Sequence, residues 1–532
     1  MCHPVPVKGV AGSGVRVGGH RMLAVDLGAE TGRAIVGTFD GERLSVQEIH
    51  RFANEPVRLG SSLVWDFPRL FHETLTAVGR AAAGGQLHSV GIDAWGVDFG
   101  LLDANDRMIG LPIHYRDQRT EGAIRAVDER VSRADLFAQT GTQVHPINTL
   151  YQLVAMVRAG DPALREARTL LMIPDLVLRF LSGSVVVEST NATTTQCLDI
   201  STGDWAHGLL AKLGLPDQIL PPVIPPGTVL GPLLPSVADE TGASRTMVVA
   251  PATHDTAAAV AAIPLDRPGT TVWISSGTWS LVGLEVDRPF LNPAALEANL
   301  TNEGGLGGRI LLQKSVTGLW LVQECRRALA RAGMDVDHRT LEGLARSAPG
   351  GTAFVDPDDE RFFRPGDLPQ AVRAYCRETG QSEPSDAGTM IRVLLESLAL
   401  KYAWSIRLLE RVTGQTIDRI HVVGGGAQNE LLCQLTADAS GLPVMAGPIE
   451  AAAIGNLLSQ ATAAGRIANL EEARELVRRS FLVQSHEQIC DWTEVRERYA
   501  RVATRTTGLT STIRSDLPAD RARSGGPRAE SH

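Results

Sequence analysis

The sequence predicts an α/β protein of two domains, and three features favour this fold. The chain has 532 residues, which is too long for a single hydrophobic core. Short apolar strands followed by helical stretches occur in both halves. Three of the strands lead into glycine-rich turns, at residues 26–33, 275–280 and 424–429. Glycine lets a backbone approach a phosphate closely, so such turns in both halves suggest a nucleotide held between two domains.

Composition excludes several other classes of protein. The chain is 43% hydrophobic and 21% charged, as globular proteins are. Its net charge of −9 does not indicate binding to nucleic acid or to an anionic membrane. No apolar run is long enough to cross a bilayer. Residues 1–20 lack the apolar segment of a signal peptide, so we expect a cytoplasmic protein. The six cysteines form no CxxC pair, which indicates reduced thiols rather than zinc ligands or disulfides.

The first half of the chain is expected to open with a strand hairpin around the first glycine turn. Strand 22–25 enters this turn and strand 34–39 leaves it. Further strands are predicted at 89–93 and 99–102. A last strand, 247–251, runs almost directly into the Ala-rich helix 256–262.

The second half repeats this opening. Strands 271–275 and 281–285 flank the second turn, strand 420–423 enters the third, and helices are predicted at 318–332, 387–411 and 429–440. The repetition is one of topology rather than of sequence. We place the N-terminal domain at 21–264 and the C-terminal domain at 265–495, with tails 1–20 and 496–532 expected to be disordered because they contain few large apolar residues.

The common nucleotide motifs are missing from the sequence. There is no GxxxxGK[ST], and Gly12-Ser13-Gly14 precedes the first strand and so cannot be a Rossmann fingerprint. No HExxH or GxSxG stands in a suitable context. We therefore expect the phosphates to be bound by the strand-turn-strand hairpins.

The strings DLGAETGR at 26–33 and GIDAWGVDF at 91–99 resemble those of the FGGY carbohydrate kinases of the actin/Hsp70/hexokinase superfamily. Further similar strings lie at 115–119, 148–153, 190–196, 254–257, 275–280, 301–305, 318–320 and 423–429, and the similarity spans about residues 22–495. The resemblance implies two ribonuclease-H-like (actin-like ATPase) α/β domains with an interdomain cleft, which holds ATP and a sugar and closes to exclude water.

Several of these strings are most similar to family members that act on L-rhamnulose. The implied reaction is transfer of the γ-phosphoryl group of ATP, with Mg²⁺, to the 1-hydroxyl of L-rhamnulose, in L-rhamnose breakdown. The implied partners are the sugar and ATP, without nucleic acid or membrane, in a monomer or small homo-oligomer.

Asp255 is the candidate catalytic base. It lies where a buried strand ends and a helix begins, a position from which a carboxylate can reach a substrate proton. Position alone also fits an Asp that caps the helix, and the two roles are compatible. The matching Asp of the family is the base, so the resemblance implies that role here.

The resemblance also implies a set of nucleotide contacts. Asp26 would hold Mg²⁺, directly or through water, although an Asx turn is the simpler interpretation of an Asp at a hairpin. Thr278, Gly425 and Gln323 would contact the nucleotide from the other domain, although plain turns and a solvent-exposed helical Gln are alternatives. The β- and γ-phosphates would lie against the backbone or side chains of Ala29, Glu30, Thr31, Gly32 and Arg33.

For the sugar, the candidates are Gly96 and the run His254, Asp255 and Thr256. Glycine permits close approach of a polar substrate, and Trp95 offers a ring face to a deoxysugar methyl group, or is simply a core residue. Ser315 stands where the family has Asn against the substrate. Its side chain is shorter, so we expect this contact to be indirect or lost, and the sugar preference stays open. The charged run 115–119 is read as a solvated face.

Two other functions remain open from the sequence. Within the class, the chain fits a kinase for another ketose such as L-fuculose or L-xylulose. Outside it, the chain fits a superfamily ATPase driven by a partner, or a degenerate sugar-binding regulator. Intact phosphate turns beside His254-Asp255 argue against an inactive protein.

Overall fold

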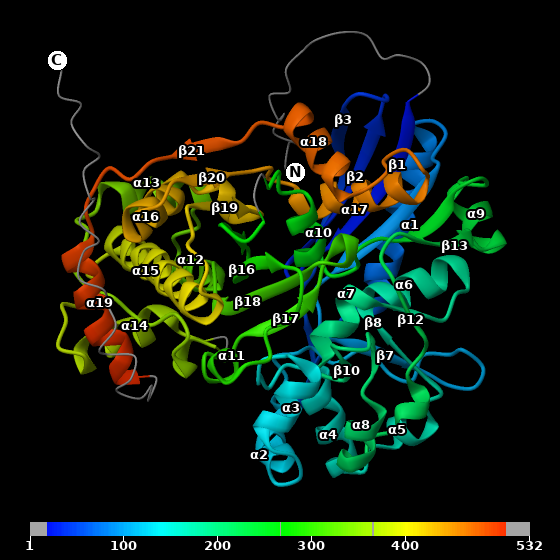
Figure 1. The fold of residues 1–532 in the computed structure, drawn as a ribbon, viewed down its shortest axis with the longest axis horizontal. Coiled ribbons are helices and arrows are strands. Elements are labelled where there is room, and N and C mark those ends of the chain that lie inside the picture. Colours follow the sequence, from blue (N-terminus) through cyan, green and yellow to red (C-terminus); the bar gives the residue numbers. More distant parts are fainter. Residues whose placement is uncertain (1–18, 266–267, 364–365, 507–532) are drawn as a thin grey trace, which may run out of the picture.

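The computed structural model describes residues 19–265, 268–363 and 366–506, which form two lobes (Figure 1). The N-terminal lobe is built on a mixed sheet. Its strands, in spatial order, are β13 (Thr228–Pro232), β14 (Met247–Ala250), β6 (Ser89–Ala94), β1 (His20–Leu27), β2 (Thr31–Phe39) and β3 (Leu44–Ala53).

The C-terminal lobe has a sheet of the same kind. Its strands, in spatial order, are β17 (Thr301–Gly304), β18 (Ile310–Thr317), β16 (Trp279–Val286), β15 (Thr271–Ser276), β19 (Arg419–Val423), β20 (Val444–Ala446) and β21 (Gln484–His486).

The two sheets share one topology. In each, the first strand pairs antiparallel with the second across a glycine turn, as β1 with β2 and β15 with β16. On its other side the first strand pairs parallel with a strand reached through a long connection, β6 or β19. This confirms the predicted duplication and the actin-like two-domain α/β fold. Parallel strands covered on both faces need near-continuous apolar runs, and β1 and β19 have them.

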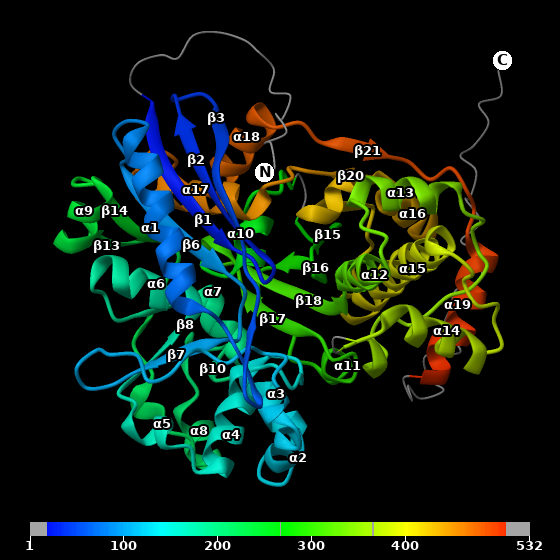
Figure 2. The same ribbon diagram turned by 180° about the vertical axis from the view of Figure 1, so that it is seen from behind.

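Helices cover both faces of the N-terminal sheet, and a long insertion extends below it in Figures 1 and 2. The helices are α1 (Phe67–Ala83), α2 (Ala123–Asp128), α3 (Arg133–Thr140), α4 (Thr149–Ala159), α5 (Pro162–Glu166), α6 (Ile173–Ser182), α7 (Ser189–Ala192), α8 (His207–Leu213), α9 (Pro235–Thr241) and α10 (Asp255–Ala261). Short strand pairs join them: β4 (Val57–Leu59) with β5 (Ser62–Val64), β7 (Phe99–Leu102) with β8 (Thr169–Met172), β9 (Val187–Glu188) with β12 (Val223–Ile224), and β10 (Leu198–Asp199) with β11 (Asp204–Trp205).

The C-terminal lobe packs around one long helix. Helix α15 (Ala387–Thr413) is buried along most of its length. The other helices are α11 (Pro293–Glu297), α12 (Trp320–Arg331), α13 (His338–Ser347), α14 (Leu368–Glu378), α16 (Glu430–Ser440), α17 (Ala451–Ala463), α18 (Leu470–Ser480) and α19 (Thr493–Thr506). In the described part of the chain, no helix combines the length and apolarity needed to span a membrane.

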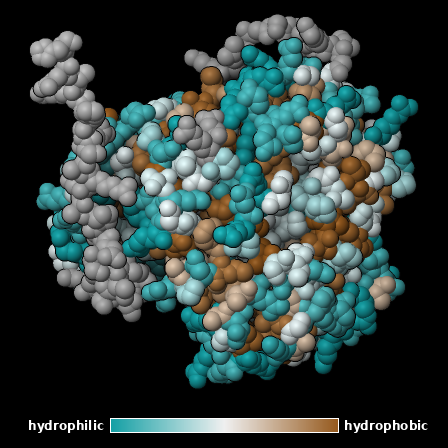
Figure 3. Space-filling view, viewed as in Figure 1, coloured by the Kyte–Doolittle hydropathy of each residue, from teal (hydrophilic) through white to brown (hydrophobic). Residues whose placement is uncertain are grey.

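Besides the core inside each lobe, residues of both lobes form a further hydrophobic core where the lobes meet. Helix α10 packs against α17, and α17 also lies on β1 and β6 of the other lobe. Both views show α17 and α18 beside β1–β3 (Figures 1 and 2). Gly455 permits this crossing, since a Cβ there would lie 1.8 Å from the carbonyl oxygen of Ala258. The space-filling view shows hydrophobic residues toward the centre of one face and hydrophilic ones along its margins (Figure 3).

The expected C-terminal tail is ordered further than its composition indicated. Helix α19 continues to Thr506, well past the predicted boundary at residue 495. Its Tyr499 is buried and packs edge-on against Phe354, which explains the helix. The remaining tail residues, 1–18 and 507–532, lie outside the described residues.

Candidate active site

A cavity of about 390 Å³ lies between the two lobes and is lined by residues of both. All three glycine turns contribute to its wall. Of the site residues expected from the sequence, the structure brings to this cavity Asp26, Ala29, Glu30, Thr31, Arg33, Gly96, His254, Asp255, Thr256, Thr278, Ser315, Gln323 and Gly425.

Gly32 is the exception among the expected residues. It lies in β2, and a Cβ at this position would come within 2.1–2.8 Å of the ring of Phe52. It does not line the cavity. Packing against Phe52 is sufficient to require glycine at this position.

The second and third glycine turns lie together because β15 and β19 are parallel neighbours. Gly424 has a φ of 79°, a conformation that favours glycine, and a Cβ there would lie 3.0 Å from the carbonyl oxygen of Ser276. The second turn also holds the start of α12 beside the cavity, because the backbone N–H of Leu319 donates to the carbonyl of Gly277 at 2.9 Å. These contacts form a continuous glycine-rich wall on the C-terminal side.

Gln323 on α12 carries an unused acceptor. Its Oε1 atom is buried and has no hydrogen-bond partner among the described residues. Buried acceptors are rarely left unpaired, so this oxygen is a candidate to accept a hydrogen bond from a ligand. This is not the solvent-exposed Gln of the simpler interpretation.

Asp255 is the first residue of α10, and His254 occupies the N-cap position. The Asp255 side chain is 33% exposed and opens onto the cavity. Burial raises the pKa of this carboxyl, and the neighbouring His254 opposes the shift. The Thr256 hydroxyl donates to it at 3.2 Å. The carboxylate is thus held at the cavity wall without being consumed as a helix cap.

Negative charge is concentrated beneath the first turn. Asp26 and Asp93 face each other across the parallel pair β1 and β6, and burial raises the pKa of both. Asp26 raises the pKa of Asp93 further, and Asp255 raises the pKa of both. Arg33 pairs with Asp26 at 3.0 Å, whereas one oxygen of Asp93 has no partner among the described residues.

This charge distribution fits a divalent cation. Mg²⁺ usually binds through one or two carboxylates, with waters and substrate phosphates completing its shell. No ready-made set of three His, Cys, Asp or Glu ligands occurs within the described ranges. Asp26, which is buried and lines the cavity, fits the single-carboxylate pattern.

Ion pairs cross between the lobes at the nucleotide end. Arg33 also pairs with Glu450 of the C-terminal lobe at 2.6 Å, and Glu30 faces Arg327 of α12 at 3.4 Å. Arg33 is therefore not a free surface residue but a link between Asp26 and the opposite lobe. Both pairs lie beside the turn expected to hold the phosphates.

The end of the cavity that is expected to hold the sugar contains a strained turn. Val97 has a φ of 70°, which is unusual for a β-branched residue. Its N–H donates to Thr194 Oγ1 at 3.0 Å, and its carbonyl accepts from Thr149 Oγ1 at 2.7 Å. A Cβ on Gly96 would come within 2.7 Å of the Thr194 side chain. Such strain persists only where the surroundings fix it, commonly at functional sites.

Trp95 is a buried residue that also reaches the cavity. Its ring packs against Trp65 with centroids 4.2 Å apart, and it also lines the cavity. The indole N–H groups of Trp65 and Trp95 both donate to the Asp98 carboxylate. This carboxylate also accepts from the Tyr115 backbone N–H and the Gln152 side-chain amide. Burial raises the pKa of Asp98 to about 6. This carboxylate organises the turn from beneath.

Ser315 on β18 does not act alone. Its hydroxyl accepts a hydrogen bond of 2.7 Å from the side-chain amide of Gln143, which belongs to the opposite lobe. Both residues line the cavity. The short Ser side chain therefore leaves room for Gln143.

Sequence reasoning missed several residues of the cavity. Asn148, Thr194, Trp279 and Glu303 lie within similar strings but were given no role there, and nothing in the sequence pointed to Gln143, His145 or Glu450.

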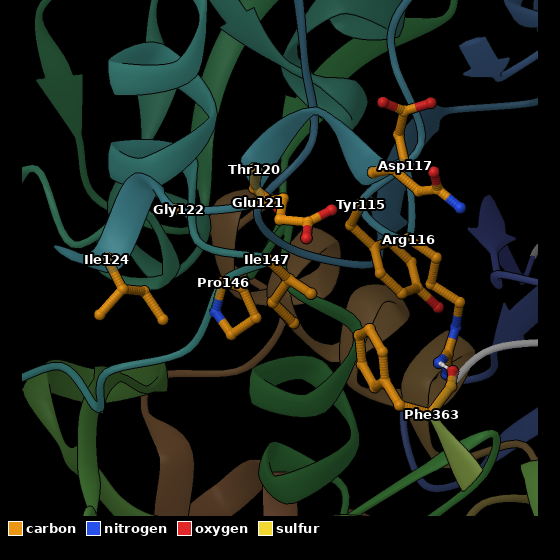
Figure 4. A pocket seen from close by; sticks show the side chains of 11 residues that line it. Tyr115, Arg116, Asp117, Thr120, Glu121, Gly122, Ile124, Pro146, Ile147 and Phe363 are labelled. Atoms are coloured by element: carbon orange, nitrogen blue, oxygen red, sulfur yellow. Dashed lines mark hydrogen bonds between the residues drawn. The ribbon is translucent and has the colours of Figure 1, made fainter. Parts of the chain in front are cut away.

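The charged run 115–119 is not a solvated face. A cavity of about 150 Å³ opens beside this run, where Arg116 lies next to Tyr115 and Phe363 (Figure 4). Arg116 is only 7% exposed. Its guanidinium lies 4.3–5.4 Å from the ring centroids of Tyr115, Trp279, Trp320 and Phe363, and it donates to the Phe363 carbonyl. The aromatic rings explain why this charge is buried.

Two domains of one topology, with glycine turns facing one cavity, are the arrangement of the actin-like ATPase class. Residues 21–262 match the N-terminal domain of the FGGY family of carbohydrate kinases, and residues 272–464 match its C-terminal domain. The chain belongs to this family. It is a carbohydrate kinase and, as such, an enzyme that uses ATP.

Known relatives are similar over nearly their whole length. The rhamnulokinase of Oceanobacillus iheyensis is 38% identical over 470 residues, covering 88% of this chain and 98% of that one. The rhamnulokinase of Klebsiella pneumoniae is 41% identical over 463 residues, covering 86% and 92%. A ligand-bound xylulose kinase from Lactobacillus acidophilus superposes with a TM-score of 0.72 at 15% identity, covering 93% and 99%, and supports the fold.

Proposed function

We propose that this kinase transfers the γ-phosphoryl group of ATP to the 1-hydroxyl of L-rhamnulose, giving L-rhamnulose 1-phosphate and ADP. The carrying observation is the position of Asp255 in a cavity that also receives all three glycine turns. The relatives that bear the name rhamnulokinase, at 38–41% identity, support this sugar.

Asp255 acts as the base that accepts the proton of the attacking hydroxyl. A base must be within hydrogen-bond reach of that proton in the substrate complex, and the cavity opening at Asp255 allows this. Gly96, His254, Thr256 and Ser315 orient the sugar around it. Holding the hydroxyl in line with the phosphate supplies much of the rate enhancement in phosphoryl transfer.

The first and second turns bind the phosphates from opposite lobes. Ala29 to Thr31 contribute from the first turn and Thr278 from the second, while Gly425 and Gln323 contact the nucleoside. Asp26 holds Mg²⁺, which when bound neutralises phosphate charge and polarises the phosphoryl group. Arg33 is released from Asp26 toward the phosphates when they bind. We propose a monomer or small homo-oligomer in the cytoplasm, acting in L-rhamnose breakdown.

An ADP-release assay with Mg-ATP, a panel of ketoses and a blank without sugar tests this function. We expect release to depend strongly on L-rhamnulose. Preference for L-fuculose or L-xylulose would move the specificity and keep the mechanism. Release without any sugar would mean that the acceptor is wrong and that a partner-driven ATPase is the better interpretation.

A further inference from the structure

A row of three side chains, of which Glu303 and His254 are buried, leads from the C-terminal lobe to Asp255. Glu303 Oε2 lies 3.2 Å from His254 Nδ1, and His254 Nε2 lies 3.5 Å from Asp255 Oδ1. The exposed fractions of the Glu303 and His254 side chains are 9% and 8%. The two nitrogens of one imidazole thus face two different carboxylates.

Glu303 reaches this row from the opposite lobe. It lies on β17, whereas His254 and Asp255 belong to the N-terminal lobe. The residues on either side of Glu303 are bound to the N-terminal lobe through their backbones. Asn302 N–H donates to the Gly141 carbonyl at 2.9 Å, and Gly304 N–H donates to Thr193 Oγ1 at 2.9 Å. Strand β17 therefore places the Glu303 carboxylate at the contact between the two lobes.

The Glu303–His254 contact is close but is not aligned as a hydrogen bond. Both Glu303 Oε2 and His254 Nδ1 are buried and have no aligned hydrogen bond within the described part of the chain. Such contacts often align only when substrate binds. Burial disfavours the imidazolium form, but Glu303, Asp255 and Glu188 together raise the pKa of His254.

We propose that Glu303 is a positioning residue that holds the His254 side chain against Asp255, so that the base is fully oriented only when the two lobes meet. The inference rests on the proposed role of Asp255 as the base. It makes the catalytic arrangement depend on both lobes, because the carboxylate that fixes His254 comes from the lobe that carries the nucleotide turns. A structural ion pair without this role would stabilise the lobes but leave turnover unaffected.

Glu303→Gln tests the proposal through a measurement that needs no substrate, the titration of His254. The proton resonances of His254, assigned by comparison with His254→Gln, are titrated by NMR in the full chain. We expect the His254 midpoint to move to lower pH by about one unit in Glu303→Gln, because an opposite charge within reach is lost. Glu450→Gln is the matched control, since it removes a cavity carboxylate that pairs with Arg33 instead. The control should leave the His254 titration unchanged.

A double-mutant cycle gives the second reading. With the best sugar substrate, Glu303→Gln should lower kcat at least about tenfold with little change in the KM for ATP. If Glu303 acts through His254, the double variant with His254→Gln should be no slower than His254→Gln alone. Additive losses would overturn the proposal, and so would a wild-type kcat in a folded Glu303→Gln enzyme.

Glu303→Asp keeps the test decisive if Glu303→Gln does not fold. It retains the charge on a shorter side chain, so we expect a kcat between those of the wild type and His254→Gln. A kcat equal to the wild type would contradict the proposed positioning. If no sugar is phosphorylated at all, the proposed function fails, while the His254 titration still reports on the Glu303 contact.

Discussion

At the scale of single residues, burial sets the chemistry of the cleft. Burial raises the pKa values of Asp26, Asp93 and Asp255. Repulsion from Asp255 adds to the shifts of Asp26 and Asp93. Arg33 offsets part of this charge at Asp26. A base with a raised pKa accepts a proton more readily, and clustered carboxylates attract a cation. The same burial therefore serves both proposed roles.

Replacing Asp255 should separate binding from chemistry. Asp255→Asn keeps the size of the side chain but removes its capacity as a base, so we expect turnover to fall at least about a hundredfold. ATP binding, followed by calorimetry, should be largely retained. Asp239→Asn, an exposed Asp on α9, is the control and should leave turnover unchanged. Near-normal turnover of Asp255→Asn would exclude this residue as the base.

Asp98 should make stability depend on pH. Its pKa is raised to about 6 in the folded protein, above the ordinary value of 3.8, so between these pH values the folded state binds more protons than the unfolded state. Stability from this group is therefore greatest at low pH and is lost as pH rises toward 6. The measurement is urea unfolding of the wild type and Asp98→Asn from pH 4 to 7. The stability of the wild type relative to the variant should fall with rising pH, by at most about 1.4 kcal/mol per unit. A constant difference would contradict the raised pKa.

At the scale of elements, the crossing of α10 and α17 joins the two lobes. The apolar faces of these helices meet residues of β1, β2 and β15 in a shared core. Because α10 begins at Asp255, the crossing also fixes the start of the helix that carries the proposed base. Packing here bears on both stability and activity.

Gly455→Ala tests this crossing. The new methyl group would lie 1.8 Å from the Ala258 carbonyl oxygen, so the helices must move apart. We expect a loss of about 1–3 kcal/mol in unfolding free energy, with reduced turnover. Gly343→Ala on α13 is the control, since nothing lies within 4 Å of its Cβ position. There the better helix propensity of Ala should leave stability equal or slightly higher. Equal effects of the two substitutions would contradict the close packing.

The elements around the glycine turns could be predicted because their signals are local. Strand β6 is a short segment of mostly small and β-branched residues and helix α10 is Ala-rich, and the predicted bounds of both lie within a residue or two of those observed. The strands β9, β10, β11 and β12 of the insertion between β7 and β13 gave no such signal, because each is too short to show a pattern.

The site was predicted where glycine, Asp or His stands in a recognisable string. Gln143 and His145 carry no local mark of their position, and only folding brings Gln143 to Ser315 of the other lobe. The buried state of Arg116 depends on rings from distant parts of the chain, which no local pattern shows. Gly32 shows another limit, since the sequence does not reveal that this glycine also packs against Phe52.

At the scale of the whole molecule, contacts across the lobes surround the cavity. They comprise the pairs Arg33–Glu450 and Glu30–Arg327 at one end. At the other, Arg116 of the N-terminal lobe lies among Trp279, Trp320 and Phe363 of the C-terminal lobe. The structure is therefore held with the lobes together, as a kinase that excludes water requires.

Arg116→Ala should weaken this association. A desolvated cation among aromatic rings contributes about 2 kcal/mol, so we expect a lower midpoint of thermal unfolding and KM values raised severalfold for both substrates. Scanning calorimetry and steady-state kinetics measure these effects. Arg125→Ala, whose exposed side chain pairs only with Glu129 among the contacts described, is the control. Unchanged KM values in Arg116→Ala would separate the aromatic contact from substrate binding.

The most direct test of the whole account is phosphorus NMR of the products formed from Mg-ATP and L-rhamnulose. The account predicts a new sugar phosphate resonance coupled to the protons of carbon 1, appearing together with ADP. The same mixture with Asp255→Asn should show neither over the same time. Inorganic phosphate in place of a sugar phosphate, or phosphorylation at another carbon, would contradict the proposed reaction.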